Sequence, residues 1–327
     1  MLVSGRGGHA RYAHRGSAAT AGERTSRMRA LQFTSFGGPE VIEWGDAPDR
    51  HPGPGEVRVS VRAASVNPID WKRFSGAMSG GKTMTRTGYL GYDAAGVVDE
   101  VGESVNGVSV GDDVFGLGQN THAEYAVLTS WAAKPPSVDW AVAAAAAVAG
   151  ETGERGLRLL GVTAGDTVFI DGGAGGVGAV AVQMAVARGA TVIASSGESN
   201  QDYLTEIGAT PVRYGDGVVD RVRQAASSSV DAVFDVVGKT PVDDLISLVA
   251  QPSKVVTIAN FGAGDAGVRV TSGGADMQPM AALAHVAELL ADNRLVVKVQ
   301  TFPFDRADEA FRISQGGHVR GKLVLVP

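Results

Sequence analysis

One glycine-rich segment has the residue types and the spacing of a phosphate-binding loop. The run Thr-Val-Phe-Ile-Asp at 167–171 leads directly into Gly-Gly-Ala-Gly-Gly-Val-Gly at 172–178, which contains the pattern G-x-G-x-x-G at Gly173, Gly175 and Gly178. In such a loop the first glycine makes a tight turn, the second lets the backbone approach a pyrophosphate, and the third lets a helix pack on a strand. The start of the following helix supplies free N–H groups and partial positive charge. Since the pattern follows a predicted strand and opens a predicted helix, it favours a dinucleotide site over a glycine-rich turn without a ligand.

The residues after the next predicted strand bear on the choice of dinucleotide. That strand, 191–194, ends in Ser195-Ser196-Gly197, where a site for NAD usually has an acidic residue that binds the ribose 2′-hydroxyl. Small polar residues leave room for a 2′-phosphate, so we expect NADPH rather than NADH. Two observations stand against this: Glu198 would repel the phosphate if it turned inward, and the serines could instead cap the following helix.

The third strand of this half of the chain is followed by Arg213 and Tyr214. They are candidates for binding the 2′-phosphate, and the alternative is that both are ordinary surface residues.

Two patterns of predicted secondary structure along the chain indicate two domains. Up to about residue 128, short β-type runs are separated by Gly and Pro, which predicts a β-rich, barrel-like domain; these runs are 29–33, 56–64, 94–101, 113–115 and 123–128. From about residue 139, helical and strand-like segments alternate, which predicts a doubly wound parallel sheet. The expected segments are an Ala-rich helix, then 156–160, strand 167–170, helix 176–188, strands 191–194, 230–236 and 254–258, and helix 278–291.

The last strand-like runs, 295–304 and 322–326, are expected to return to the first domain. The sequence therefore predicts an α/β protein with a β-rich domain over 28–148, completed by 293–327, and a cofactor domain over 149–292. Residues 1–27 contain five Arg, one acidic residue and no apolar period, so they are excluded from the fold. They are interpreted as a disordered extension or a mis-assigned start, although their composition also suits an organellar transit peptide.

Composition limits the kinds of partner. The formal net charge of −6 gives no electrostatic reason to expect nucleic acid or an anionic membrane. The most apolar stretch, 138–150, is shorter than the ~20 residues that a spanning helix needs. The chain has no Cys, which excludes disulfides, thiolate catalysis and cysteine-ligated zinc. We expect a cytoplasmic protein that acts on a small molecule.

Further segments occur in an order that is similar to a known family. They are QFTSFGGPEV at 32–41, SVNPID at 65–70, GYDAAGVV at 91–98, VGDDVFG at 110–116 and GHVRGKLVL at 317–325. Together with the glycine loop they make the chain, from residue 28 to its end, resemble the zinc-independent quinone oxidoreductase branch of the medium-chain dehydrogenase/reductase superfamily, which includes zeta-crystallin. The resemblance implies a GroES-like β-rich catalytic domain and a Rossmann cofactor domain.

The same resemblance implies chemistry without a metal. Zinc-dependent members of the superfamily have Gly-His-Glu where this chain has Gly91-Tyr92-Asp93, so no zinc is expected. The remaining chemistry is direct hydride transfer from NADPH to a quinone or to the β-carbon of an α,β-unsaturated carbonyl, in which the protein positions the cofactor.

Site residues follow from the resemblance. Asn67 and Tyr92 are expected to be catalytic and to line the nicotinamide and the substrate, although Tyr92 could simply wall the pocket and Asn67 could serve the turn before Pro68. Asp70 and Asp93 are assigned to structure. The residues expected to contact the cofactor are Asn67, Thr152, Gly173, Ala174, Gly175, Gly176, Val177, Gly178, Ser195, Ser196, Tyr214, Val237, Ile258 and Asn260.

Two other functions remain open at this stage. An enoyl-thioester reductase would use the same scaffold, and a non-catalytic NADPH-binding redox sensor would bind the cofactor without reducing an acceptor. The resemblance also implies a homodimer, and Val268-Arg269-Val270 is the candidate edge strand for it.

Overall fold

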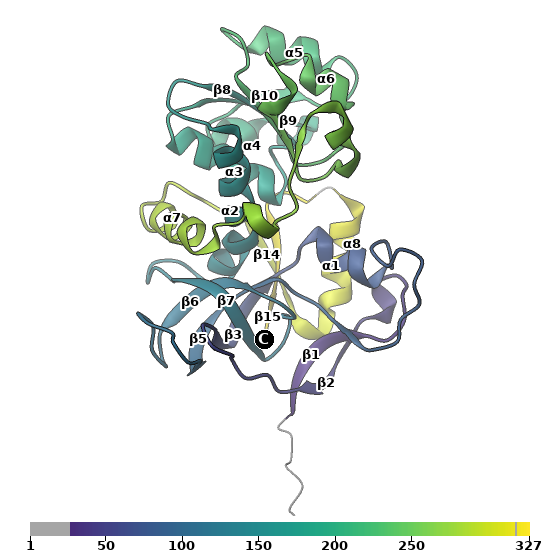
Figure 1. Cartoon of the computed structure of the whole chain (residues 1–327), viewed down its shortest axis with the longest axis vertical. Helices are drawn as coiled ribbons and strands as arrows, with labels where there is room; N and C mark the ends of the chain where they lie inside the picture. The colour runs from purple at the N-terminus through teal and green to yellow at the C-terminus, as the bar shows by residue number, and fades with distance from the viewer. Residues whose placement is uncertain (1–26, 318) are drawn as a thin grey trace, which may run out of the picture.

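The computed structural model describes residues 27–317 and 319–327, which form a β-barrel domain and a parallel-sheet domain (Figure 1). The barrel consists of β3 (Val57–Ser65), β5 (Asp93–Val101), β6 (Asp113–Gly118) and β7 (Tyr125–Ala133). These strands are antiparallel, and β3 pairs with both β5 and β7, so the sheet closes on itself. Most of the proposed extension, residues 1–26, lies outside the described part of the chain.

Alternating side chains explain why β3 lies in the barrel. Val57, Val59 and Val61 are buried, while the residues between them are partly exposed, as expected for a strand with one face on a core. The same core takes Phe74 from α1 (Pro68–Phe74) and Phe311 from α8 (Ala307–Gly316), whose rings meet edge to face. A small sheet of β2 (Glu43–Pro48), β1 (Arg27–Phe33) and β4 (Gly88–Tyr89) lies beside it.

The end of the chain returns to the barrel domain, as predicted. β15 (Lys322–Val326) pairs antiparallel with β3, and β14 (Val299–Pro303) pairs parallel with β15. Residues far apart in the sequence therefore share one sheet, and the β-rich domain includes both ends of the described chain.

The second domain is a six-stranded parallel sheet with the order β10-β9-β8-β11-β12-β13. Its strands are β8 (Thr167–Asp171), β9 (Thr191–Ser196), β10 (Thr210–Arg213), β11 (Ala232–Asp235), β12 (Val255–Thr257) and β13 (Arg269–Val270). The order reverses between β8 and β11, and in sheets of this kind ligands bind at that point, outside the carboxyl ends of the strands. The predicted Rossmann architecture is confirmed.

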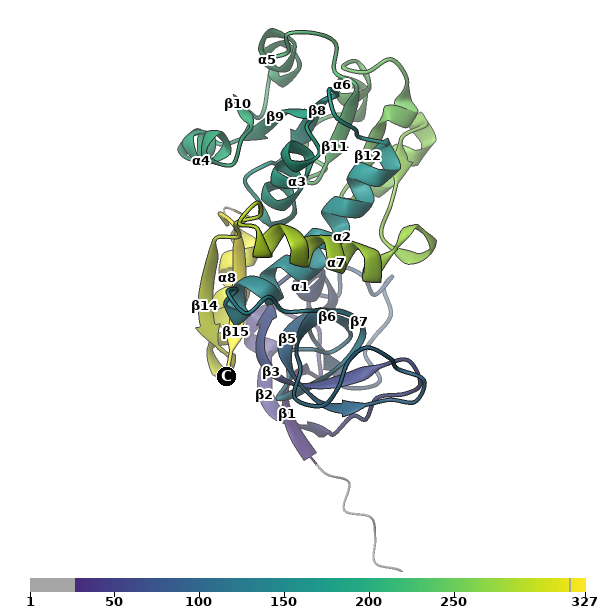
Figure 2. The same ribbon diagram turned by 90° about the vertical axis from the view of Figure 1, so that its left-hand side faces the viewer.

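Helices cover both faces of this sheet (Figure 2). One apolar core includes residues of α2 (Trp140–Leu160), α3 (Gly176–Ala187), α4 (Gln201–Glu206) and α7 (Pro279–Ala291). The other includes residues of α5 (Val218–Ala225) and α6 (Val242–Ile246).

Helix α2 joins the two domains. The prediction separated 156–160 from the Ala-rich helix, but the structure has one continuous helix of 21 residues. Five consecutive alanines, 143–147, are fully buried, and their small side chains let α2 pack closely on the barrel, on α3 and on α7. The predicted boundary at 148/149 therefore falls inside α2, and the division into domains at that point stays a prediction.

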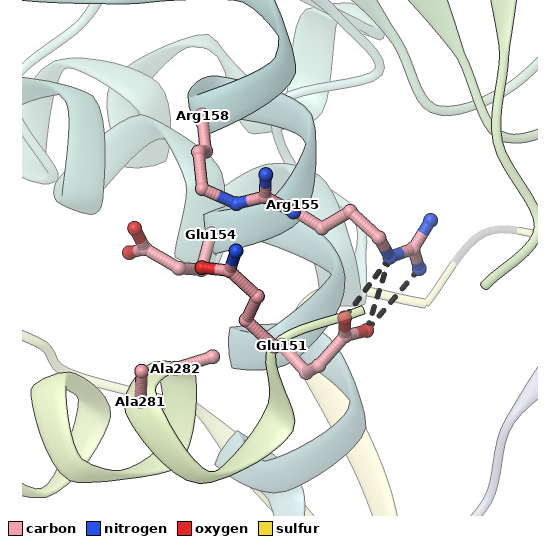
Figure 3. A pocket seen from close by; sticks show the side chains of 7 residues that line it. Glu151, Glu154, Arg155, Arg158, Ala281 and Ala282 are labelled. Atoms are coloured by element: carbon pink, nitrogen blue, oxygen red, sulfur yellow. Dashed lines mark hydrogen bonds and ion pairs between the residues drawn. The ribbon is translucent and has the colours of Figure 1, made fainter. Parts of the chain in front are cut away.

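Charged side chains bond one another at the junction of α2 and α7 (Figure 3). Glu151 and Arg155 form a buried ion pair at 3.0 Å within α2. Glu154 accepts hydrogen bonds from Arg188 Nη2 at 2.5 Å and from His285 Nδ1 at 2.8 Å. A small pocket here is lined by these paired groups, which identifies it as a packing junction.

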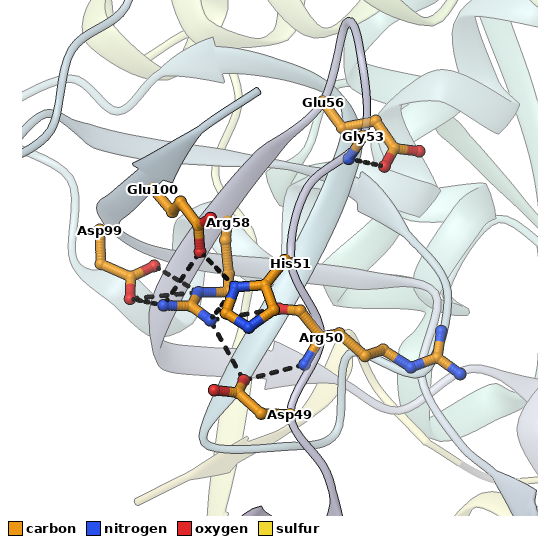
Figure 4. Close-up of polar contacts among 8 residues, drawn as sticks. All are labelled: Asp49, Arg50, His51, Gly53, Glu56, Arg58, Asp99 and Glu100. Carbon is orange, nitrogen blue, oxygen red and sulfur yellow. Dashed lines mark hydrogen bonds and ion pairs between the residues drawn. The ribbon is translucent and has the colours of Figure 1, made fainter. Parts of the chain in front are cut away.

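A second charged cluster ties surface segments of the barrel together (Figure 4). Arg58 on β3 donates to Asp99 on β5 at 2.8 Å and to Asp49 at 3.1 Å. His51 Nδ1 lies 2.8 Å from Glu100 Oε2. The segment before β3 is thereby held against β5.

The junction of α2 and α7 predicts a specific pH dependence of stability. Burial raises the pKa of Glu154, but hydrogen bonds from His285 and Arg188 outweigh burial and lower it from 4.5 to about 2. A carboxyl with a depressed pKa stabilises the fold above its unfolded pKa, and this contribution is lost as the pH falls from 4.5 through about 2. We expect Glu154→Gln to reduce the free energy of unfolding at neutral pH by on the order of 1–2 kcal/mol, allowing for partial solvent screening, and the difference from wild type to shrink across that interval.

Urea unfolding at several pH values measures this difference. Glu206→Gln is the control, because Glu206 forms an exposed ion pair with Lys298, and such pairs contribute little to stability. A difference between wild type and Glu154→Gln that stays constant as the pH falls would contradict the assignment.

Candidate functional site

The glycine loop forms a tight turn over residues 172–175, closed by a hydrogen bond from the Gly175 N–H to the Gly172 carbonyl at 3.3 Å. Gly172 has a φ of +92°, which favours glycine, whereas Gly173 is not among the residues with positive φ. Gly173 is needed for a different reason: a Cβ there would lie 2.6 Å from the Cβ of Ala194 on β9. Gly173 lies in the turn as expected, and close packing against β9, not the backbone angle, excludes a side chain at this position.

The other two glycines of the pattern differ sharply in the space around them. A Cβ on Gly178 would lie 2.1 Å from the carbonyl oxygen of Gly172, so this glycine lets α3 pack on the end of β8, as predicted. A Cβ on Gly175 would meet only the carbonyl oxygen of Gly172, at 3.6 Å. The backbone at Gly175 is thus open to approach from outside the protein.

The start of α3 offers hydrogen-bond donors at this open position. The helix begins at Gly176 with Gly175 as its N-cap, and no side chain caps it. The first N–H groups of a helix have no acceptor within the helix, and the helix dipole makes this end partly positive. An exposed N-terminus with an uncrowded glycine backbone fits the pyrophosphate of a dinucleotide.

A buried carboxylate holds the loop from below. Asp171, at the end of β8, accepts hydrogen bonds from the hydroxyls of Ser195 and Thr240, the latter at 2.7 Å. The Ser195 hydroxyl also accepts from the N–H of Gly172 at 2.9 Å. Burial raises the pKa of Asp171, the two hydroxyls oppose that shift, and Asp235 adds to it.

The two serines expected to contact the cofactor have hydroxyls that are already occupied. Ser195 is fully buried in the contacts just described. The Ser196 hydroxyl donates to the Gly197 carbonyl at 3.0 Å and accepts from Gln201 Nε2 at 2.8 Å. Both side chains hold backbone in place, and the expected cofactor contacts at Ser195 and Ser196 stay predictions. The next residue, Gly197, is small and partly exposed.

A second carboxylate organises the neighbouring loops. Asp235, at the end of β11, accepts from the N–H groups of Val237 and Gly238 at 3.0 and 2.7 Å and from the Thr257 hydroxyl at 2.7 Å. The Thr257 hydroxyl in turn accepts from the N–H of Asn260 at 3.0 Å. The predicted contact at Val237 follows β11, the neighbour of β8, and those at Ile258 and Asn260 follow β12, the next strand beyond β11. Val237 lies against Gly172.

The residues considered for the 2′-phosphate lie together beside Gly197. Tyr214 is more than half exposed, and its ring lies 3.4 Å from the position of a Cβ on Gly197. Arg213 Nη1 is 3.5 Å from Glu198 Oε2, and both side chains are largely exposed. A cation, a phenol and a small residue thus share this surface, with one carboxylate that offsets the cation.

The predicted contact at Thr152 comes from helix α2. Thr152 is largely buried, and its hydroxyl lies 3.4 Å from Arg155 Nη2. The same arginine donates to Thr271 Oγ1 at 2.8 Å, so Thr152 belongs to a polar cluster that joins α2 to the segment after β13.

Asn67 does not have the free amide that a catalytic contact needs. Its Nδ2 donates to Asp93 Oδ1 at 3.1 Å, and its Oδ1 accepts from Lys322 Nζ at 2.5 Å. Asn67 is only 3% exposed, so its amide could reach a substrate only by breaking this network. Partners on both amide atoms favour a positioning role for Asn67, and its expected catalytic role stays a prediction.

The structural assignments of Asp70 and Asp93 are confirmed. Asn67 is the N-cap of α1, and Asp70 completes a capping box by accepting from the Asn67 N–H at 2.8 Å. Asp70 also accepts from the N–H of Gly91 at 2.9 Å. Asp93 accepts from Ser65, from Asn67 and from the N–H of Val148 on α2, and burial raises its pKa.

Tyr92 keeps an accessible phenol. It is half-buried, and the guanidinium of Arg73 on α1 lies 5.7 Å from its ring centre. Burial raises the pKa of the Tyr92 phenol, and Arg73 only partly opposes this. The phenol therefore stays protonated at neutral pH and can donate a hydrogen bond.

Sequence reasoning missed Lys322, which connects the barrel to the loop. A Cβ on Gly176 would lie 2.7 Å from Lys322 Cδ, and the N–H of Gly321 donates to the Ala174 carbonyl at 3.4 Å. The signal that could have identified it is a lysine opening the otherwise apolar strand 322–326.

Two features are absent from residues 27–317 and 319–327. No three or more His, Cys, Asp or Glu side chains gather there as a possible metal site. No helix in that part of the chain is long and apolar enough to cross a membrane.

Comparisons with known proteins agree with this geometry. Residues 53–134 match the family described as alcohol dehydrogenase GroES-like domain, and residues 207–325 match the family described as zinc-binding dehydrogenase. The NADPH-dependent alkenal/one oxidoreductase of Arabidopsis thaliana, described as chloroplastic, is 28% identical, covering 92% of this chain and 80% of that protein.

Two solved structures are similar over nearly the whole described chain. The quinone oxidoreductase from Coxiella burnetii is 30% identical with a TM-score of 0.79, covering 92% of this chain and 100% of that one. A mycobacterial protein complexed with NADPH is 26% identical with a TM-score of 0.79, and the coverage is again 92% and 100%.

The contrast between Gly175 and Gly178 predicts two separable defects. Gly178→Ala should lower the free energy of unfolding by roughly 1–3 kcal/mol, because its Cβ would overlap the Gly172 carbonyl. Gly175→Ala should lower the free energy of unfolding by no more than about 1 kcal/mol, roughly the cost of alanine at an N-cap, yet weaken dinucleotide binding by about tenfold or more, since it fills the open position. Thermal unfolding and calorimetric titration measure the two effects, and undiminished dinucleotide affinity in Gly175→Ala would argue against the loop as the site.

Proposed function

Because the chain belongs to the quinone oxidoreductase branch of the medium-chain dehydrogenase/reductase superfamily, we propose that it is an NADPH-dependent reductase of quinones and α,β-unsaturated carbonyls. The observation that carries the proposal is the phosphate loop, open at Gly175 and followed by the uncapped start of α3. The acceptor class rests on relatives that are named as an alkenal/one oxidoreductase and a quinone oxidoreductase.

The residues of this chain divide the work of binding. The backbone of 173–178 would hold the pyrophosphate, and Val237, Ile258 and Asn260 would contact nicotinamide and ribose. Bound NADPH supplies the hydride. The Tyr92 phenol, whose pKa burial raises further above neutrality, is protonated and could donate a hydrogen bond to the acceptor oxygen. Asn67 would act as a positioning residue, by holding the end of β3 in place.

Preference for NADPH over NADH follows from the surface beside Gly197. Arg213 and Tyr214 would receive the 2′-phosphate, which would compete with Glu198 for the arginine. The absence of cysteine in the full sequence excludes the cysteine-ligated zinc of metal-dependent relatives, so the proposed reduction proceeds without it.

Two features of the proposal come from the sequence and family resemblance. We expect a homodimer joined at β13, which is an edge strand of the parallel sheet. We also expect a cytoplasmic location.

An acceptor panel tests the proposed activity. Loss of reduced nicotinamide absorbance is followed for NADPH and NADH with quinones, alkenals and enones, and an enoyl-CoA, and cofactor binding is measured separately. We expect acceptor-dependent oxidation of NADPH, faster with quinones or enones than with the enoyl-CoA.

Each of the other functions predicts a different result. Faster turnover of the enoyl-CoA than of every quinone and enone would favour an enoyl-thioester reductase. Saturable NADPH binding without oxidation by any acceptor would favour a redox sensor.

The 2′-phosphate assignment is tested by Arg213→Gln. We expect its KM for NADPH to rise about three- to tenfold, as for the loss of a partly exposed charge-assisted contact, while its KM for NADH stays unchanged. Arg223→Gln is the matched control, since Arg223 is a similarly exposed arginine on α5 that bonds Ser247. An equal effect on both cofactors would contradict a role at the 2′-phosphate.

A further inference from the structure

Lys322 is a buried lysine at the place where the two domains meet. It is the first residue of β15, is 5% exposed, and lies beside the end of β3. Burying an ammonium is costly unless its donors are satisfied. A leucine or valine at this position would continue the apolar strand without the free-energy cost of burying an ammonium.

The ammonium bonds neutral acceptors and not a carboxylate. Lys322 Nζ donates to Asn67 Oδ1 at 2.5 Å and to the Val66 carbonyl at 3.3 Å. The carboxylate of Asp93, which is near enough to influence the pKa of Lys322, is instead occupied by Ser65, Asn67 and Val148. The positive charge of Lys322 is therefore not neutralised by a directly bonded partner among the described residues.

The stem of the same side chain packs on the phosphate loop. Its Cδ would lie 2.7 Å from a Cβ on Gly176, the first residue of α3. The preceding residue, Gly321, donates its N–H to the carbonyl of Ala174 in the loop. One side chain thus contacts the first turn of α3 at its stem and the barrel at its tip.

We propose that Lys322 is a positioning residue that locks the phosphate loop onto the barrel and supplies buried positive charge to the pyrophosphate of the bound dinucleotide. Charges interact much more strongly in a buried, low-dielectric setting than in water. The start of α3 alone provides partial charge, whereas two phosphates carry formal negative charge, so a nearby buried cation complements them.

The electrostatics around Lys322 agree with this role. Burial lowers the pKa of Lys322, while Asp93 and Asp70 oppose the shift. Since an opposite charge favours the ionised form of a lysine, a bound anion would add to the effect of these two carboxylates.

This inference rests on the proposed function, and a pair of lysine variants tests it. Lys322→Met removes the ammonium and keeps an unbranched side chain. Lys134→Met is the matched control, because Lys134 is also buried and its Nζ also bonds acceptors, the carbonyls of Val138 at 2.9 Å and Pro135 at 3.2 Å. Lys322→Gln is the milder second variant if Lys322→Met folds poorly.

Calorimetric titration with NADPH and with adenosine 2′-phosphate separates charge from general loosening, because the second probe lacks the pyrophosphate. We expect Lys322→Met and Lys322→Gln to raise the Kd for NADPH about tenfold or more, the range for loss of an interaction with a charged group, and to leave the Kd for adenosine 2′-phosphate unchanged. Lys134→Met should lower only the Tm.

Three results would overturn the inference. If the wild-type protein binds NADPH and both Lys322 variants bind it with an unchanged Kd, the inference is refuted and the proposed function stands. The same conclusion follows if the variants bind NADPH and adenosine 2′-phosphate with equally weakened affinity. Failure of the wild-type protein to bind NADPH would refute the proposed function and this inference with it.

Discussion

The geometry of the candidate site depends on buried carboxylates that must be satisfied by hydrogen-bond donors. A carboxylate away from water is costly unless donors surround it. Asp171, Asp235 and Asp93 are almost wholly buried, and each obtains its donors from segments that form the site. The loops cannot move far without leaving one of these carboxylates unpaired. The buried carboxylates therefore fix the positions of the loops.

This constraint explains why the most polar residues of the loops are not the ones that face a ligand. Ser195 and Ser196 have the side chains that would suit a cofactor contact, yet their hydroxyls bond Asp171 and local backbone. What remains open is backbone at Gly175 and exposed side chains such as Val237 and Tyr214. Under the proposed function, recognition of a dinucleotide would rely on backbone N–H groups and on the shape of the loop, both of which these hydroxyls hold in place.

A second set of contacts makes the two domains one unit. Asp93 of the barrel accepts from the N–H of Val148 in the middle of α2. Lys322 on β15 packs its stem on the glycine loop and donates a hydrogen bond to Asn67 on the barrel. Because hydride transfer needs donor and acceptor in close and fixed alignment, contacts that hold the cofactor domain on the barrel bear directly on the proposed chemistry.

The sequence by itself determined the elements whose signals are local. The Rossmann strands, the phosphate loop and the return of 322–326 to the barrel domain follow from period, glycine spacing and ordered family segments, each carried by a few neighbouring residues. The tertiary structure decided everything that depends on distant partners: the packing of Gly173 against Ala194, the serines as backbone supports, Asn67 as a satisfied network member, and Lys322 as its partner. Asn67 and Lys322 are 255 positions apart, and no local pattern encodes such a pairing. Residue type shows which hydrogen bonds a side chain can make, whereas only the packed fold shows which of them are already made.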